Sequence, residues 1–153
     1  MPIIFTNFQR SIEMSWAIAA YDHAETHFSL ICVVPDCRQL RLTSNDSLIY
    51  KKFRQAFPDM EVEHLTEEML KSPEQKEASY IRSNIRMLWR PFCMEFEGVI
   101  EDFNQGTLLR LDANKGYDEA NTCVVPRIQF LAIEIARNRQ GLNDRVKKTA
   151  TVS

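Results

Sequence analysis

The fold of this chain is decided by the stretch FNQGTLLRLDANKGYDEANTCVVPRIQFLAIEIARNRQG, residues 103–141. The stretch runs through an apolar segment and an acidic loop, and then enters a helix that is apolar on nearly every side. At about 100° per residue, Arg127, Glu134 and Asn138 share one narrow polar stripe, while apolar side chains cover most of the remaining surface. We therefore predict that this last helix is buried.

Length and composition favour a single globular domain. The chain has 153 residues, of which 44% are apolar and 26% are charged, and its net charge is −2. These values are ordinary for a soluble protein, and no apolar run approaches the ~20 residues that a bilayer requires. Scattered cysteines and the lack of an evident secretory signal favour reduced thiols and the cytoplasm. We expect an N-terminal arm at 1–10, one domain at 11–144 and a flexible tail at 145–153.

The first half of the chain is expected to be mainly helical. Ser11 can cap a helix that runs to Val33, ahead of Pro35. Thr43 and Asp46 fit a capping box that opens a second helix, which Pro58 ends. The weak alternation from Met60 to Leu65 fits either a short strand or a loop.

The second half begins with another helix signal. Residues 72–75, Ser-Pro-Glu-Gln, are a strong helix start, and an apolar stripe follows for about eight turns. Pro91 interrupts this stripe, so we predict two helices, at about 73–89 and 91–104, that share a face packed on the first and last helices. Gly106 should end the second of them in the left-handed conformation.

The remaining elements are short. We predict a strand at 107–111 and a turn at 114–116. The last helix should start between Asn121 and Pro126 and finish at Gly141 and Asn143. The fold class is therefore α+β, a helix-dominated single domain with about five helices and two or three short strands.

Four possible metal ligands occur within fifteen residues. His23 and His27 stand one helical turn apart, and Cys32 and Cys37 follow. Together they could form a tetrahedral zinc site. Both histidines, however, fall within the apolar side of the first helix, which favours the alternative of core histidines without a metal.

An acidic cluster is formed by Glu95, Glu97, Glu101 and Asp102. Paired carboxylates can perform acid–base catalysis or bind Mg²⁺, but they are also common on solvated helix faces. No phosphate-binding glycine loop or GxSxG motif accompanies them, and we expect no cofactor. An acidic surface for docking a partner is a third interpretation.

The polar stripe of the last helix has two interpretations. Glu134 lies three residues before Arg137 and four before Asn138, and Arg127 shares the stripe. Arg127 and Glu134 could lock the helix to a neighbouring element through ion pairs, which we favour, or the polar stripe could face a partner.

Five segments resemble one eukaryotic family, the polysaccharide biosynthesis domain-containing protein 1 family. They cover most of the chain in order: IEMSWAIAAYDHAE (12–25), LRLTSNDSLIYKKFRQAFP (40–58), EEMLKSP (67–73), WRPFCMEFEGVIEDFNQGTLLRLD (89–112) and PRIQFLAIEIARNRQGLND (126–144). The resemblance implies a dedicated cytosolic chaperone, not an enzyme, that binds the nascent GTP-binding domain of translation elongation factor 1-alpha during synthesis and assists its GTP-coupled folding.

That client is a basic protein, so an acidic surface would suit it. We expect a monomer without direct contacts to nucleic acid or membranes. The two longest matching segments hold the polar residues expected to bind the client, which are Asp102, Arg110, Arg127, Glu134 and Arg137. The alternative is a small enzyme of carbohydrate biosynthesis or methyl transfer, as the family name suggests. A deep polar cleft would favour the enzyme, and a broad shallow face the chaperone.

Overall fold

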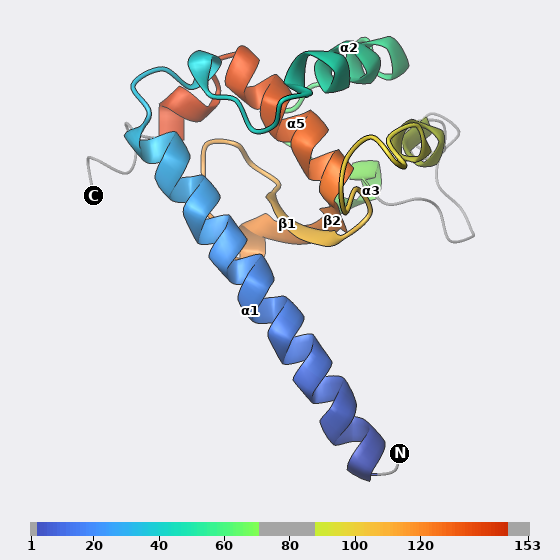
Figure 1. Ribbon diagram of the computed structural model, residues 1–153. Helices are drawn as coiled ribbons and strands as arrows, with labels where there is room; N and C mark the ends of the chain where they lie inside the picture. The colour runs from blue at the N-terminus through green and yellow to red at the C-terminus, as the bar shows by residue number, and fades with distance from the viewer. Residues whose placement is uncertain (1–2, 71–87, 147–153) are drawn as a thin grey trace.

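Helices and one small antiparallel sheet make up the computed structural model, which describes residues 3–70 and 88–146 and the side chains of the first helix from Met14 onward (Figure 1). The predicted fold class, a helix-dominated α+β domain, is confirmed. Among the described residues, no helix combines the length and the apolar character needed to cross a membrane.

Helix α1 spans Ile3–Val33 and ends, as predicted, just before Pro35. It begins eight residues earlier than the predicted start at Ser11, because no glycine or proline between Ile3 and Ser11 interrupts it. Residues 3–10, predicted as an arm, therefore belong to this helix. The C-terminal half of α1 lies along the rest of the protein, and its N-terminal end projects away (Figure 1).

Helix α2 spans Asp46–Ala56, after a short 3₁₀ turn, η1, at Cys37–Gln39. The predicted contact between Thr43 and Asp46 is confirmed, since the Asp46 carboxylate accepts hydrogen bonds from the Thr43 amide at 2.7 Å and the Thr43 hydroxyl at 2.8 Å. The Thr43 hydroxyl accepts a hydrogen bond from the Asn45 amide at 2.9 Å, which stabilises the loop before the helix.

The segment that follows the undescribed residues 71–87 differs from the prediction. Residues 88–94 are helical without a break at Pro91, and turns follow from 95 to 105, so neither the separation at Pro91 nor the helix 91–104 is correct. The chain reverses at Gly98, whose φ of 76° is accessible to glycine at little cost. The predicted helix 73–89 lies almost wholly outside the described residues.

Strands β1, Gly106–Arg110, and β2, Thr122–Pro126, form an antiparallel hairpin in which Gly106 pairs with Pro126. The predicted strand at 107–111 is confirmed to within one residue. Gly106 begins this strand and does not cap a helix, so that prediction was wrong. A β-carbon at Gly106 would lie 3.1 Å from the indole nitrogen of Trp16, which donates a hydrogen bond to the Gly106 carbonyl at 3.1 Å. The glycine therefore permits α1 to approach the sheet.

Helix α5, Arg127–Arg139, starts later than predicted. Strand β2 occupies the predicted start, because Thr122, Val124 and Val125 are β-branched and favour extended backbone. Every residue from 128 to 138 is buried, which confirms the prediction of a buried helix. Gly141 follows with a φ of 74°, as expected at its end.

The core surrounds α5. An aromatic group packs beside it, in which the rings of Phe57 and Trp89 lie 4.3 Å apart and the Trp89 indole donates a hydrogen bond to the Met69 carbonyl in α3, Glu67–Leu70. A second, smaller cluster joins Ile31, Cys37 and Val146, so packing extends to Val146. Residues 60–65 are irregular, with one isolated antiparallel β-bridge between His64 and Asp112.

Candidate functional site

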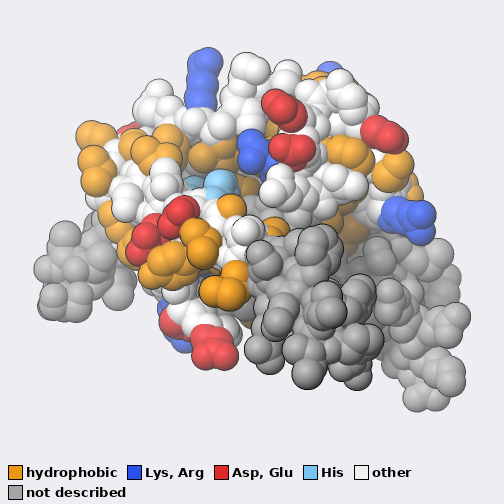
Figure 2. All heavy atoms as spheres, turned by 60° about the horizontal axis from the view of Figure 1, so that its bottom comes forward, with side chains coloured by type: hydrophobic (Ala, Val, Ile, Leu, Met, Phe, Trp, Pro, Cys, Tyr) orange, Lys and Arg blue, Asp and Glu red, His pale blue; other side chains and the backbone are white. Residues whose placement is uncertain are grey.

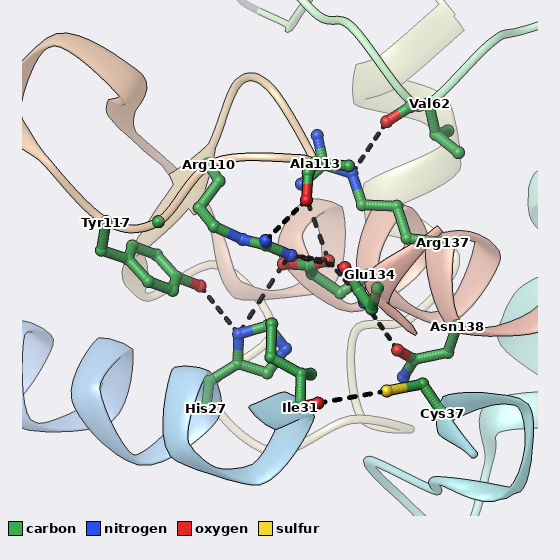
Figure 3. A network of polar contacts seen from close by, with 12 residues as sticks. His27, Ile31, Cys37, Val62, Arg110, Ala113, Tyr117, Glu134, Arg137 and Asn138 are labelled. Atoms are coloured by element: carbon green, nitrogen blue, oxygen red, sulfur yellow. Dashed lines mark hydrogen bonds and ion pairs between the residues drawn. The ribbon is translucent and has the colours of Figure 1, made fainter. Parts of the chain in front are cut away.

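A buried ion network occupies the centre of the molecule (Figure 3). The Nη2 atom of Arg110, on β1, lies 3.1 and 3.0 Å from the two carboxylate oxygens of Glu134, on α5. One turn further along α5, Nη1 of Arg137 lies 3.6 Å from the same carboxylate. All three side chains are 0% exposed. The favoured interpretation, a lock between the helix and a neighbouring element, is therefore confirmed for Glu134. Among the described residues its arginine partners are Arg110 and Arg137, and not Arg127 as predicted.

The two guanidinium groups also bind backbone carbonyls. Arg110 donates to the carbonyl of Ala113 at 2.9 Å, and Arg137 donates to the carbonyls of Val62 at 2.8 Å and Leu111 at 3.0 Å. These carbonyls belong to irregular segments, although that of Leu111 also accepts a hydrogen bond from the Leu65 amide at 2.9 Å. The network thus holds the loops at 62 and 111–113 against α5.

His27 extends the network to α1. Its Nδ1 shares a hydrogen bond with the Tyr117 hydroxyl at 2.9 Å and lies 3.7 Å from Glu134. Burial lowers the pKa of His27 to about 4, although the Glu134 carboxylate acts in the opposite direction. Burial, the largest single effect, would raise the pKa of Glu134, but the nearby charges, that of Arg110 first, together outweigh it and hold that pKa below its ordinary range. At neutral pH the network holds two positive charges, one negative charge and a neutral imidazole.

Three of the four possible zinc ligands make other contacts. The rings of His23 and His27 each lie 5.1 Å from Phe130 in edge-to-face contact, and the Cys37 thiol donates to the Ile31 carbonyl. Within residues 3–70 and 88–146, no group of three or more potential ligands is arranged to hold a metal ion. The geometry favours core histidines over a zinc site.

The acidic cluster lies on the surface. We call residues 95–102 the acidic turn, in which the side chains of Glu95, Glu97, Glu101 and Asp102 are exposed. Glu95 forms a salt bridge with Lys52 at 3.0 Å. In the described part of the chain, the other three carboxylates have no ion-pair partner. The acidic turn therefore presents a group of exposed carboxylates.

The segment that follows the acidic turn is bonded to the start of α5. The carbonyls of Phe103 and Gln105 accept hydrogen bonds from the first two amides of α5, those of Ile128 and Arg127, each at 2.8 Å. This satisfies amides that a helix leaves unpaired at its start, and the helix dipole favours acidic groups nearby. Asp102 has a φ of 55°, an unusual conformation for a residue other than glycine.

The five predicted partner-binding residues divide into two groups. Arg110, Glu134 and Arg137 lie in the interior, where they stabilise the fold and offer no surface. Asp102 is exposed, and Arg127 is partly buried at the start of α5. The structure does not bring the two groups together. Of the predicted residues, only Asp102 and Arg127 are accessible to a partner.

Sequence reasoning missed Tyr117 and Asn143 in the network. Asn143 accepts a hydrogen bond from Arg110 at 2.6 Å, and Tyr117 reaches His27 from 90 residues away in the sequence. Neither residue lies on a periodic face or in a motif, so no local signal could have found them.

A small polar hollow opens on the described surface. It measures about 300 Å³ and lies between α2 and the C-terminal end of α5, with Arg38, Arg41 and Arg139 among its lining residues. Such a volume is at the lower limit for a small-molecule site. Its one lining carboxylate, Asp46, already accepts hydrogen bonds from the loop that precedes α2. The hollow therefore contains no acid–base pair with free capacity.

These features define a class of protein: a helix-dominated α+β domain whose strongest charge network is structural and whose surface carries an acidic turn. The chain belongs to the PBDC1 protein family, because the sequence model of that family matches residues 12–148. This confirms the resemblance noted from the sequence segments.

Known relatives agree with this assignment. The chain is similar to mouse Protein PBDC1, with 52% identity over 135 residues, which are 88% of this chain and 63% of the mouse protein. It is 45% identical over 137 residues to the Saccharomyces cerevisiae homolog of Protein PBDC1, covering 87% of this chain and 86% of that one. The solution NMR structure of yeast protein yst0336 matches with a TM-score of 0.74 and 42% identity, covering 92% of this chain and 91% of that chain. The chain thus spans less than two thirds of the mouse relative.

Proposed function

We propose that this chain is a cytoplasmic chaperone that binds the nascent GTP-binding domain of translation elongation factor 1-alpha and assists its GTP-coupled folding. It acts as a monomer and needs no nucleic acid or membrane contact. Membership of the family supports this proposal, because the sequence resemblance implies that activity. The structural observation that carries it is the acidic turn, which offers exposed carboxylates to a basic client.

Electrostatic attraction gives the acidic turn a physical role. A nascent domain is available for binding only while it is being synthesised, so fast association matters. Complementary charge raises association rates by ~10-fold to 10³-fold, and the effect weakens as salt screens it. Glu97 and Glu101 are exposed and can act in this way without any change in the fold.

The enzyme alternative receives less support from the polar residues at the centre. Glu134 is the most buried carboxylate, and Arg110 and Arg137 hold it in its charged form. A general acid or base requires a pKa close to the working pH, so Glu134 is unsuited to that task. The network is better explained as the scaffold that positions the surface.

The test is to identify the nascent chains that the protein captures. Ribosome–nascent-chain complexes should be isolated on the tagged protein, and their encoded polypeptides identified. The proposal predicts strong enrichment of elongation factor 1-alpha, beginning once its GTP-binding domain has left the ribosome. Enrichment of unrelated chains to the same degree, or none above background, would reject it.

A further inference from the structure

The solvent side of α1 is unusually apolar for a surface helix. Met14, Ile18 and Tyr21 are 64%, 59% and 58% exposed, and their spacing of four and three residues places them on one face. We call this the outer face of α1. The buried side of the same helix, which includes Ala20 and Ala24, packs on the rest of the protein. A surface helix normally carries polar residues on the side turned to water.

The outer face continues into a hollow beside Tyr117. This hollow measures about 420 Å³ and is lined by Tyr21, Ala24, Glu25, Phe28, Ser29 and Tyr117. The rings of Phe28 and Tyr117 stand edge to face, with centroids 6.5 Å apart. Pockets with aromatic walls are where apolar anchor residues of a partner bind most strongly. The outer face therefore combines an apolar stripe with a site for one anchor.

Between residues 14 and 33, the charge of α1 is of one sign. The only charged side chains in this range are Asp22 and Glu25, and there is no lysine or arginine. Both carboxylates are exposed, and Glu25 forms a hydrogen bond with the Tyr21 side chain. Figure 2 shows apolar and acidic side chains next to one another on the face that it brings forward.

We infer that the outer face of α1 is a docking surface for a basic amphipathic helix of a partner protein. Such a helix would cover the stripe with its apolar side, place one large side chain in the hollow beside Tyr117, and bring lysine or arginine to Asp22 and Glu25. The inference goes beyond the proposed function, because it does not depend on the identity of the client or on the acidic turn.

Charge excludes the two other obvious occupants. An anionic membrane surface would be repelled by Asp22 and Glu25, and α1 offers no basic residue there to attract it. A second copy of the chain would bring its own Asp22 and Glu25 to the same contact, where like charges oppose association. A basic helix satisfies both the apolar stripe and the carboxylates.

The inference can be tested with two synthetic helical peptides that share a leucine face. One carries lysine on its polar face and the other carries glutamate, and binding to the full chain is followed by fluorescence anisotropy. We expect only the lysine peptide to bind. The double substitution Ile18→Ser and Tyr21→Ser should weaken binding about tenfold or more, as removal of two apolar contacts requires. The matched control Leu30→Ser, on the other side of α1, should bind as the wild type does.

A charge swap provides the second arm. With Asp22→Lys and Glu25→Lys, the preference should reverse toward the glutamate peptide while the melting temperature stays unchanged. Equal binding of both peptides, or unchanged binding by the Ile18 and Tyr21 variant, would overturn the inference. Self-association that the same two serine substitutions abolish would also overturn it, in favour of a dimer contact. Binding to anionic vesicles with the same dependence would identify a membrane surface instead.

Discussion

Substitution of Glu134 by Gln should destabilise the fold far more than any surface change. Glu134→Gln keeps the shape of the side chain but removes the one negative charge between Arg110 and Arg137. Two guanidinium groups, each 0% exposed, would then face each other without a counter-charge. The carbonyls that bind them cannot replace a full negative charge.

The size of the effect follows from this burial. Removal of one partner from a buried ion pair costs about 3–5 kcal/mol, because the remaining charge stays desolvated. For a domain of this length, that loss lowers the melting temperature by roughly 6–20 °C. The matched control Glu97→Gln removes an exposed carboxylate in the acidic turn and should change stability by less than about 0.5 kcal/mol.

Urea unfolding followed by circular dichroism measures both variants. A third variant sharpens the test: Arg110→Met, Glu134→Leu and Arg137→Met together remove all three charges. Replacement of a whole buried ion network by apolar residues is often close to neutral, so this triple variant should be more stable than Glu134→Gln alone. If the free energy of unfolding of Glu134→Gln lies within about 1 kcal/mol of the wild-type value, the network does not hold the fold together.

Three further predictions concern pH, backbone and nucleotide. His27 has a folded pKa of about 4 against 6.5 in the unfolded chain, so the unfolded state binds more protons between these values. The free energy of unfolding should therefore fall by roughly 3 kcal/mol from pH 6.5 to 4, and most of this slope should be absent in His27→Gln; an equal slope in both would refute the assignment. Gly141→Ala should lower the free energy of unfolding by about 1 kcal/mol because of the φ of 74° at this position, and Gly141→Asn should lower it less. Chemical denaturation measures both variants. An alanine variant as stable as the wild type would show that the turn relaxes. The chain alone should not bind GTP at micromolar concentrations in calorimetry, since its four glycines are scattered and form no phosphate loop; measurable heat of binding would contradict this.

The sequence predicted the elements that depend on local pattern. The apolar surface of residues 128–136 predicted a buried helix, and the short β-favouring segment 107–111 predicted β1. The ion-pair role of Glu134 and Arg137 followed from their spacing on that helix. These features are encoded within a few residues of one another.

The rest depends on contacts between distant segments. Arg110 meets Glu134 only because the hairpin places β1 against α5, and Tyr117 reaches His27 across 90 residues. The acidic residues were predicted to lie in a helix, but residues 95–105 form turns, with Gly98 at a positive φ of 76°. Gly106 looked like a helix end, yet its role is to admit Trp16. A single sequence does not show such contacts.

The central claim is that the acidic turn captures the nascent GTP-binding domain of elongation factor 1-alpha. The most direct measurement is the capture of that domain during cell-free translation by the wild type, by Glu97→Lys with Glu101→Lys, and by the control Glu61→Lys with Glu119→Lys, which changes net charge equally at exposed positions. We expect that only the variant with Glu97→Lys and Glu101→Lys loses capture, by about tenfold or more at low salt, while all three proteins keep the same melting temperature. Equal capture by the two double variants, or no capture by the wild type, would contradict it.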